Sequence, residues 1–124
     1  MGVIYHLSIE SEFRQRSQGG EYRPARFEQD GFIHCAGDET TALAVARSYF
    51  RAATEAVLVV RIELGKLASP CRFEAPAPLP GGGEHRTPGK TFPHIYGPLN
   101  LSAVTGVAPL VRRGDDFGWP STFA

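Results

Sequence analysis

Apolar and polar residues alternate in short stretches along the chain, and these stretches predict strands and short helices in turn. A β-branched and aromatic run over residues 3–7 predicts a first strand, and Ser8 after it is a typical helix N-cap. Residues 9–17 have helical spacing of apolar and charged positions, and Gly19 and Gly20 follow them. We therefore expect a strand and then a short amphipathic helix at the start of the fold.

The middle of the chain repeats this order with longer elements. Residues 32–35 predict a second short strand, and Asp38 is placed to cap a helix that runs to about residue 53. Residues 56–64 form the strongest predicted strand, because the first half of this segment is apolar on both faces. A strand of that kind belongs in the middle of a sheet.

The last part of the chain predicts shorter elements. Residues 71–74 alternate as a strand does, and the proline and glycine content of residues 75–90 predicts a flexible loop. The remaining predicted elements are an aromatic, proline-punctuated stretch at 91–99, one helical turn at 101–104, a strand at 107–111 and an extended C-terminal tail at 113–124 that lays Phe117 and Trp119 on the body.

Strands and short helices are interspersed without a regular βαβ rhythm. This order predicts an α+β fold on a twisted sheet, mixed or mostly antiparallel, with short flanking helices. A chain of 124 residues, of which 42% are hydrophobic, suits one apolar core. We therefore expect a single domain over residues 1–124.

The charge composition excludes broad electrostatic binding. Because 13 basic residues match 13 acidic ones, the chain lacks the positive footprint of a protein that binds nucleic acid strongly and without regard to sequence. The basic residues are 11 Arg and 2 Lys, which fits either a codon composition that favours Arg or local recognition of a planar anion. No segment approaches the roughly 18 apolar residues of a membrane span. We expect a cytoplasmic protein with reduced cysteines and no membrane partner, in an oligomeric state that the sequence leaves open.

Three of the histidines lie in strand-like or rigid aromatic stretches, namely His6, His34 and His94. A histidine in an apolar strand must satisfy two ring nitrogens, so it is either paired inside the core or points into a polar cleft. Alternation along the extended chain places His94 and Tyr96 on one face, where both can bind a ligand. We take His34 and His94 as the candidate catalytic residues.

A metal site, a cysteine nucleophile and a carboxylate at a cleft are further interpretations of the sequence. His34 and Cys35 are neighbours in a strand, so their side chains leave opposite faces and cannot hold one ion. The local spacing of the usual zinc ligands is missing, and we expect no metal ion and an inert thiol. Glu74 lies either at the rim of a cleft or in a surface ion pair with Arg72 or Arg23.

Four motifs between residue 4 and about residue 111 are dense in aromatic residues, histidine and proline. They are Ile4-Tyr5-His6, Asp30-Gly31-Phe32-Ile33-His34-Cys35, Val45-Ala46 with Tyr49-Phe50, and Phe92-Pro93-His94-Ile95-Tyr96-Gly97-Pro98-Leu99. In this order they resemble a bacterial family of unknown function, the domain-of-unknown-function family nine-five-two.

That family has a fold similar to the ADP-ribosyltransferase superfamily. The resemblance implies a split, mixed or antiparallel sheet whose central cleft accepts the nicotinamide half of NAD. It implies that His6 and His34 hold the ribose and amide end, and that Arg23 or Arg47 meets a phosphate. The expected ligand contacts are Tyr5, His6, Arg23, His34, Tyr49 and Tyr96, with NAD as the substrate.

The leading hypothesis is a domain that binds NAD or another nucleotide in a histidine-lined cleft. As an enzyme it would be an ADP-ribosyltransferase or resemble an RNA 2′-phosphotransferase. Many superfamily enzymes use a glutamate in a late strand, where this chain offers His94 and Tyr96 instead. A non-catalytic ligand-binding or regulatory module with the same fold is the alternative hypothesis, and a metal-dependent hydrolase is a third.

Overall fold

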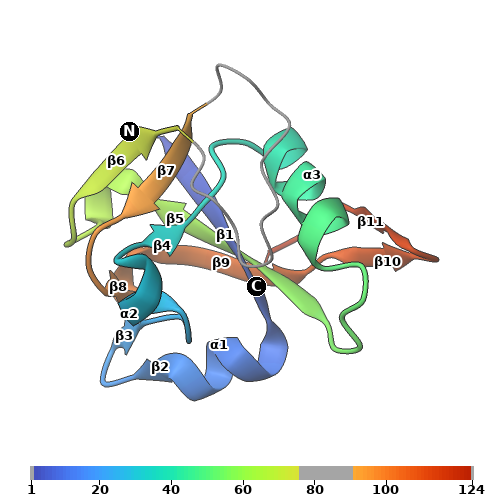
Figure 1. The fold of residues 1–124 in the computed structure, drawn as a ribbon, viewed down its shortest axis with the longest axis horizontal. Coiled ribbons are helices and arrows are strands. Elements are labelled where there is room, and N and C mark those ends of the chain that lie inside the picture. The colour runs from blue at the N-terminus through green and yellow to red at the C-terminus, as the bar shows by residue number, and fades with distance from the viewer. Residues whose placement is uncertain (1, 76–90, 124) are drawn as a thin grey trace.

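The computed structural model describes residues 2–75 and 91–123 of the chain. Within these residues the strands form small antiparallel sheets, and short helices pack around them (Figure 1). The helical elements are α1 (Glu10–Arg16), α2 (Phe27–Asp30), α3 (Glu39–Tyr49) and the 3₁₀ turns η1 (Leu64–Lys66) and η2 (Leu101–Ala103).

The central sheet has the strand order β1-β5-β9 and is antiparallel throughout. β5 (Val57–Glu63) lies in the middle, and its first four residues are all buried, as the apolar run predicts. β1 (Val3–Ile9) and β9 (Val104–Pro109) pair with it on either side. The helices and the other sheets lie on or beside this central sheet.

A second sheet, with the order β4-β7-β6, carries the histidine motifs. β7 (Phe92–Ile95) lies between β4 (Ile33–His34) and β6 (Cys71–Glu74). Ile33 and Ile95 lie opposite each other and are fully buried, so this face of the sheet joins the core. The remaining strands are β2 (Ser17–Gln18), β3 (Glu21–Tyr22) and β8 (Leu99–Asn100), which form a third sheet, and the hairpin of β10 (Val111–Arg113) and β11 (Asp116–Gly118).

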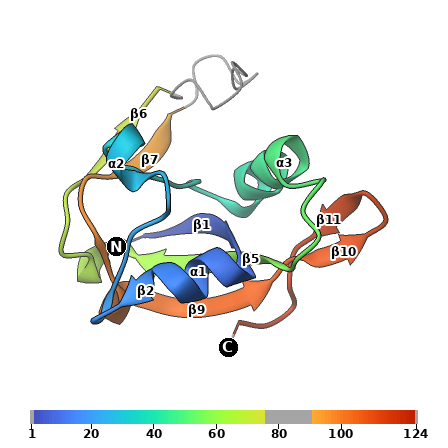
Figure 2. The ribbon, with the colours of Figure 1, turned by 60° about the horizontal axis from the view of Figure 1, so that its bottom comes forward.

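The chain has two apolar cores, where its length and composition predict one. They lie on opposite faces of the central sheet, because alternate residues of the buried strand β5 point to opposite sides. α1 packs with one core and α3 with the other, and Figure 2 shows both helices against the sheet. The buried residues of the first core are Ile4, Tyr22, Ile33, Cys35, Val60, Ile62, Ile95, Leu99 and Ala103, and those of the second are Ala46, Val57, Val59, Leu110 and Phe117.

The central and second sheets meet edge to edge at an isolated bridge between Tyr5 and Ala36. The Tyr5 N–H donates to the Ala36 carbonyl at 2.9 Å, and the Ala36 N–H donates to the Tyr5 carbonyl at 2.7 Å. The Cys35 N–H also donates to the Pro93 carbonyl at 3.0 Å, so the ladder of the second sheet continues almost to this bridge. We call this contact the sheet joint.

The observed elements confirm the α+β class, and they correct the predicted start of the first helix. The sequence predicts Ser8 as the N-cap of that helix, which is wrong because β1 continues to Ile9. Ser8 is buried in the strand, and its hydroxyl donates to the Ile9 carbonyl at 3.0 Å. The Glu55 carboxylate binds the first turn of α1 instead. It accepts hydrogen bonds from the Ser11 N–H at 2.9 Å and from the Ser11 hydroxyl at 2.7 Å.

The end of the chain also differs from the prediction of an extended tail over 113–124. The β10–β11 hairpin occupies residues 111–118, because Arg112 pairs with Phe117 and the Phe117 ring is buried in the second core. The predicted contacts of Phe117 and Trp119 with the body are confirmed. Residues 76–90 of the predicted loop lie outside the described residues. None of the described helices is long and apolar enough to span a membrane.

Candidate functional site

The face of the second sheet that points away from the first core brings the two candidate catalytic histidines together, with His34 partly exposed and His94 buried. His34 in β4 lies directly opposite His94 in β7, and Arg72 in β6 lies opposite His94 on the other side. The bond from the Cys35 N–H to the Pro93 carbonyl shows that His34 and His94 form a non-hydrogen-bonded pair. Side chains of such pairs are the closest in an antiparallel sheet, and the two imidazole centroids lie 5.7 Å apart.

Asp30 orients the imidazole of His34. The helix α2 ends at Asp30, and Gly31 reverses the chain with φ at 80°, which returns His34 to the Asp30 side chain. The Oδ2 atom of Asp30 lies 3.0 Å from Nε2 of His34, and Arg26 pairs with Oδ1 of the same carboxylate at 3.3 Å. Because a carboxylate only accepts, Nε2 of the neutral imidazole carries the proton and Nδ1 keeps a lone pair.

Burial decides the charge of His34. Desolvation lowers the pKa of His34, while the hydrogen bond and the charge of Asp30 oppose this effect. The side chain is 34% exposed, so its ring still reaches solvent. At neutral pH the imidazole is therefore neutral and can accept a hydrogen bond or a proton at Nδ1.

Glu74 holds the second imidazole and the phenol of Tyr96. Its Oε1 atom accepts a hydrogen bond from Nδ1 of His94 at 2.9 Å and a short one from the Tyr96 hydroxyl. The bond from Tyr96, followed by that from His94, lowers the pKa of Glu74, and the same bond raises the pKa of Tyr96. Both donors use Oε1, and no hydrogen bond among the described residues engages Oε2.

Phe32 packs beside both histidines. Its ring centroid lies 4.1 Å from that of His94 in a stacked arrangement and 4.7 Å from that of His34. The guanidinium of Arg72 lies 5.3 Å from the centroid of the Tyr96 ring. We call this group the histidine cluster; its members are Asp30, Phe32, His34, Arg72, Glu74, His94 and Tyr96.

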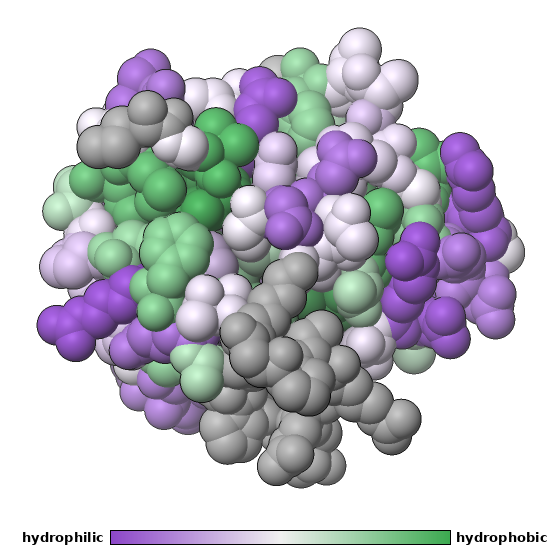
Figure 3. Space-filling view, turned by 90° about the horizontal axis from the view of Figure 1, so that it is seen from above, coloured by the Kyte–Doolittle hydropathy of each residue, from purple (hydrophilic) through white to green (hydrophobic). Residues whose placement is uncertain are grey.

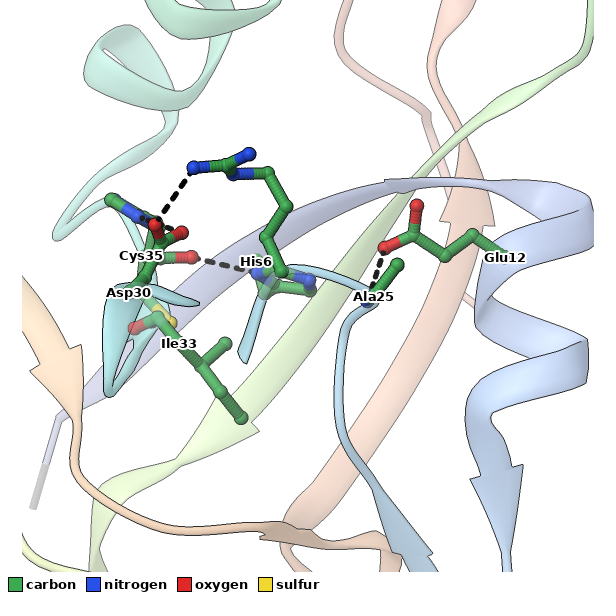
Figure 4. Close-up of polar contacts among 8 residues, drawn as sticks. His6, Glu12, Ala25, Asp30, Ile33 and Cys35 are labelled. Carbon is green, nitrogen blue, oxygen red and sulfur yellow. Dashed lines mark hydrogen bonds and ion pairs between the residues drawn. The ribbon is translucent and has the colours of Figure 1, made fainter. Parts of the chain in front are cut away.

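His6 lies beneath the histidine cluster and has both ring nitrogens engaged. Nδ1 donates to the His34 carbonyl at 2.7 Å, so Nε2 accepts from the Tyr22 hydroxyl at 2.8 Å. Burial lowers the pKa of His6 to about 4, and the ring is neutral. Figure 4 shows the His6 ring pointing toward the segment from Ile33 to Cys35, which contains β4. In this state His6 positions the backbone of His34.

The other expected ligand contacts lie apart from the histidine cluster. The Tyr5 ring packs edge-on against Trp119 at 5.0 Å, although its backbone forms the sheet joint. Arg23 pairs with Glu21 at 3.3 Å, and Tyr49 is 38% exposed near the end of α3.

Arg72 belongs to the histidine cluster and Arg26 pairs with its member Asp30, and the sequence singled out neither arginine as a phosphate contact. Arg47, which it did single out, binds Asp116 at 2.6 Å and ties α3 to the β10–β11 hairpin. Arg112 also lies at this end, where its guanidinium donates to the Ala53 carbonyl. Figure 3 shows hydrophilic surface gathered on the side of α3 and the hairpin.

The cysteines and the metal-ligating groups form no further site within the described ranges. Burial raises the pKa of Cys35 well above its usual value and also raises that of Cys71, so both thiols are protonated at neutral pH. Across residues 2–75 and 91–123, no group of three or more His, Cys, Asp or Glu side chains is arranged to hold a metal ion.

The family of the chain follows from its sequence. A family model described as a protein of unknown function, DUF952, matches residues 8–107, and the chain belongs to this family. This match confirms the family that the four motifs resemble. No curated protein matches the chain.

Solved structures of one bacterial protein share the fold. The crystal structure of protein CC0527 from Caulobacter crescentus is 28% identical, with 93% of this chain and 91% of that chain covered and a TM-score of 0.71. The solution NMR structure of CC0527 is also 28% identical, with 94% and 91% covered and a TM-score of 0.66. The crystal structure of a double mutant of the same protein is 27% identical, with 93% and 91% covered and a TM-score of 0.71.

Proposed function

We propose that the chain binds a nucleotide of the NAD class at the histidine cluster, as a domain of ADP-ribosyltransferase type. The observation that carries this proposal is the pairing of His34 and His94, each oriented by a carboxylate. Among the described residues, no hydrogen bond engages Nδ1 of His34 or Nε2 of His94. The partly exposed imidazole of His34, beside the exposed guanidinium of Arg72, suits a ribose hydroxyl and an adjoining phosphate, and the buried His94 forms the floor of the site.

Glu74 supports the catalytic form of the proposal. Superfamily enzymes that carry a late-strand glutamate use it to orient the ribose, and in this chain a carboxylate reaches the late motif from β6 instead. Because His94 and Tyr96 both bind Oε1 of Glu74, its Oε2 atom can accept a hydrogen bond from a ribose hydroxyl. The ionised carboxylate would also stabilise positive charge on the sugar as the bond to nicotinamide breaks.

The reaction would be a displacement at the ribose carbon that carries nicotinamide. The carbon–nitrogen bond breaks, its electron pair leaves with the nicotinamide ring, and a nucleophilic acceptor forms the new bond to the same carbon. A neutral His34 can take the proton that the acceptor loses, because its Nδ1 has a lone pair. Positioning and charge stabilisation supply most of the rate in such a step.

Binding and turnover are measured separately on the same protein. Titration calorimetry with NAD and with ADP-ribose tests binding, and the release of free nicotinamide tests turnover. We expect His34→Ala to weaken binding about tenfold or more, as the loss of a hydrogen bond to a positioned group does. Glu74→Gln is expected to retain binding and lose nicotinamide release. Arg14→Ala is the control, because Arg14 is exposed in an ion pair with Glu10 on α1.

The outcomes separate the hypotheses. Saturable NAD binding with no nicotinamide release above the His34→Ala level would favour the non-catalytic module. The absence of binding to NAD, to ADP-ribose and to an RNA end with a 2′-phosphate would contradict both the catalytic and the non-catalytic form of the proposal. A stoichiometric zinc signal in the purified protein would favour a metal-dependent hydrolase instead.

A further inference from the structure

The last described residues, 119–123, cover one row of side chains on the central sheet. The row consists of Tyr5, Arg61 and Gly106, which lie directly opposite one another across β1, β5 and β9. Figure 2 shows the chain returning from the β10–β11 hairpin to this sheet. We call residues 119–123 the C-terminal segment and the three residues beneath it the covered row.

Two aromatic rings of the C-terminal segment contact the covered row. The Trp119 ring meets Tyr5 edge-on at 5.0 Å, and the Arg61 guanidinium lies 4.5 Å from the centroid of the Phe123 ring. Gly106 provides the space for the second ring, because a Cβ atom at this position would lie 2.6 Å from the Cβ of Phe123. Gly106 thus leaves a gap in the row next to Arg61, and the Phe123 ring fills it. The Arg61 guanidinium also donates to the hydroxyl and the carbonyl of Thr105 at 3.0 Å each, which fixes its position beside this gap.

Side-chain contacts hold the C-terminal segment in this place. Among the described residues, no backbone hydrogen bond involves residues 119–123. Pro120 has no N–H to contribute. Release of the segment therefore breaks ring contacts and leaves every strand ladder intact.

The covered row continues the surface of the histidine cluster. Ala36 pairs with Tyr5 at the sheet joint and follows His34 by two residues, so alternation puts the side chains of His34 and Tyr5 on the same side of the joined sheets. Strand spacing places the backbones of these two residues about 8 Å apart. One extended ligand can reach both places.

We propose that the covered row is the second part of the ligand site and takes a planar aromatic ring with an adjoining anionic group. The C-terminal segment occupies this part until the ligand displaces it. The ligand ring would take the place of Phe123 over Gly106, beside the Arg61 guanidinium, and this guanidinium would meet the anion. Trp119, which packs on Tyr5, would leave with the same segment. The assignment rests on the proposed function, since it names where the second half of a dinucleotide lies.

The fluorescence of Trp119 reports this displacement, because Trp119 is the single tryptophan of the chain. Addition of NAD to the intact protein is expected to shift the Trp119 emission to longer wavelength and to increase its quenching by acrylamide. Calorimetric binding of NAD without either change would overturn the proposal.

Substitutions in the C-terminal segment test the competition. Trp119→Ala and Phe123→Ala are expected to tighten NAD binding about tenfold, the gain that follows when the covered form outnumbers the open form about ten to one. Binding of nicotinamide mononucleotide, which reaches the histidine cluster alone, is expected to stay unchanged. Phe73→Ala is the control, because Phe73 is 53% exposed on the other face of β6. NAD affinity that is unchanged or weaker in both variants, with melting temperatures preserved, would overturn the proposal.

A second probe separates this proposal from the proposed function. The dye 8-anilinonaphthalene-1-sulfonate is a planar aromatic anion, and we expect Trp119→Ala to bind it more tightly than the intact chain. Addition of Arg61→Ala to that variant should remove the gain. If NAD fails to bind but the dye shows this pattern, the covered row stands as a site and the nucleotide assignment fails. If the dye binds all three proteins equally, the covered row is not a site.

Discussion

The His6 imidazole is buried, so its protonation is linked to the folding of the chain. Its pKa is about 4 in the folded protein, below the ordinary value of 6.5, because burial penalises the charged ring. Between these two values the unfolded chain binds more protons than the folded one. The contribution of His6 to stability is therefore complete above about pH 6.5 and is lost as the pH falls toward 4.

The first prediction concerns this pH dependence. Between pH 7.5 and pH 4.5 the shift of His6 removes on the order of 2 to 3 kcal/mol from the free energy of unfolding. His6→Asn cannot titrate and should flatten the pH dependence by about this amount, although it lowers stability at neutral pH. Urea unfolding of both proteins at the two pH values provides the measurement. An equal loss of stability in both proteins would contradict the assignment to His6.

The second prediction concerns the carboxyl group of Glu74. The Tyr96 hydroxyl is the largest cause that lowers the pKa of Glu74, so Tyr96→Phe should raise this pKa toward its ordinary value. Carbon NMR of the Glu74 carboxyl during a pH titration gives the shift directly. Tyr49→Phe, on α3, is the matched control and should leave the titration unchanged. A Glu74 pKa that stays fixed in Tyr96→Phe would mean that His94 alone sets it.

The sequence predicts part of the histidine cluster for a simple reason. Side chains alternate along a strand, so the position of Tyr96 two residues after His94 is enough to place both on one face. The roles of Asp30 and Glu74 depend on which strands pair and on how α2 turns, and a single sequence does not specify these contacts. A weak signal existed for Phe32, because it precedes His34 by two residues.

At the scale of elements, the turn from α2 into β4 decides where Asp30 lies. Gly31 sits in the left-handed region with φ at 80°, and its N–H closes α2 on the Phe27 carbonyl at 2.8 Å. A side chain at this position is strained whatever space surrounds it. The turn is thus a backbone feature on which the orientation of His34 depends.

The third prediction follows from this turn. Gly31→Ala should cost about 1 kcal/mol of stability and should weaken ligand binding by moving Asp30 away from His34. Gly37→Ala is the matched control, because it lies nearby without a positive φ and its added Cβ meets an atom of Phe73 at an ordinary 4.0 Å. Thermal unfolding and calorimetry compare the two variants. Equal losses in both would mean that the strain at Gly31 is not the cause.

Sequence periodicity predicted the long elements better than the short ones. β5 and α3 each carry a strong apolar pattern, and the structure contains both. The two-residue strands β2, β3 and β8 have no room for a pattern, and partners distant in sequence define them. The C-terminal hairpin was missed for the same reason, since its strands have only three residues each.

At the scale of the whole molecule, the central sheet connects the two apolar cores. β5 contributes Val60 to one core and Val59 to the other, so neither core can lose its packing without exposing this strand. Neighbouring residues of one buried strand cannot leave their places independently. The fold should therefore behave as one cooperative unit, as expected for a single domain of this length.

The fourth prediction tests this cooperativity. Trp119 packs against the second core, so its fluorescence follows that core, while far-ultraviolet circular dichroism follows the strands and helices together. We expect both signals to give one transition with the same midpoint in urea. Two separate midpoints would show that the C-terminal segment, or the second core together with it, unfolds apart from the strands and helices.

The sheet joint has a consequence for motion. Two backbone hydrogen bonds between Tyr5 and Ala36, and one from the His6 ring to the His34 carbonyl, connect β1 to β4 and the residues that follow it. A whole ladder connects β1 to β5. Small rotations between the sheets therefore concentrate at this hinge and change the distance from Tyr5 to His34. In native-state hydrogen exchange, the amides of Tyr5 and Ala36 should exchange sooner than those of β5, and ligand binding across the hinge should slow them.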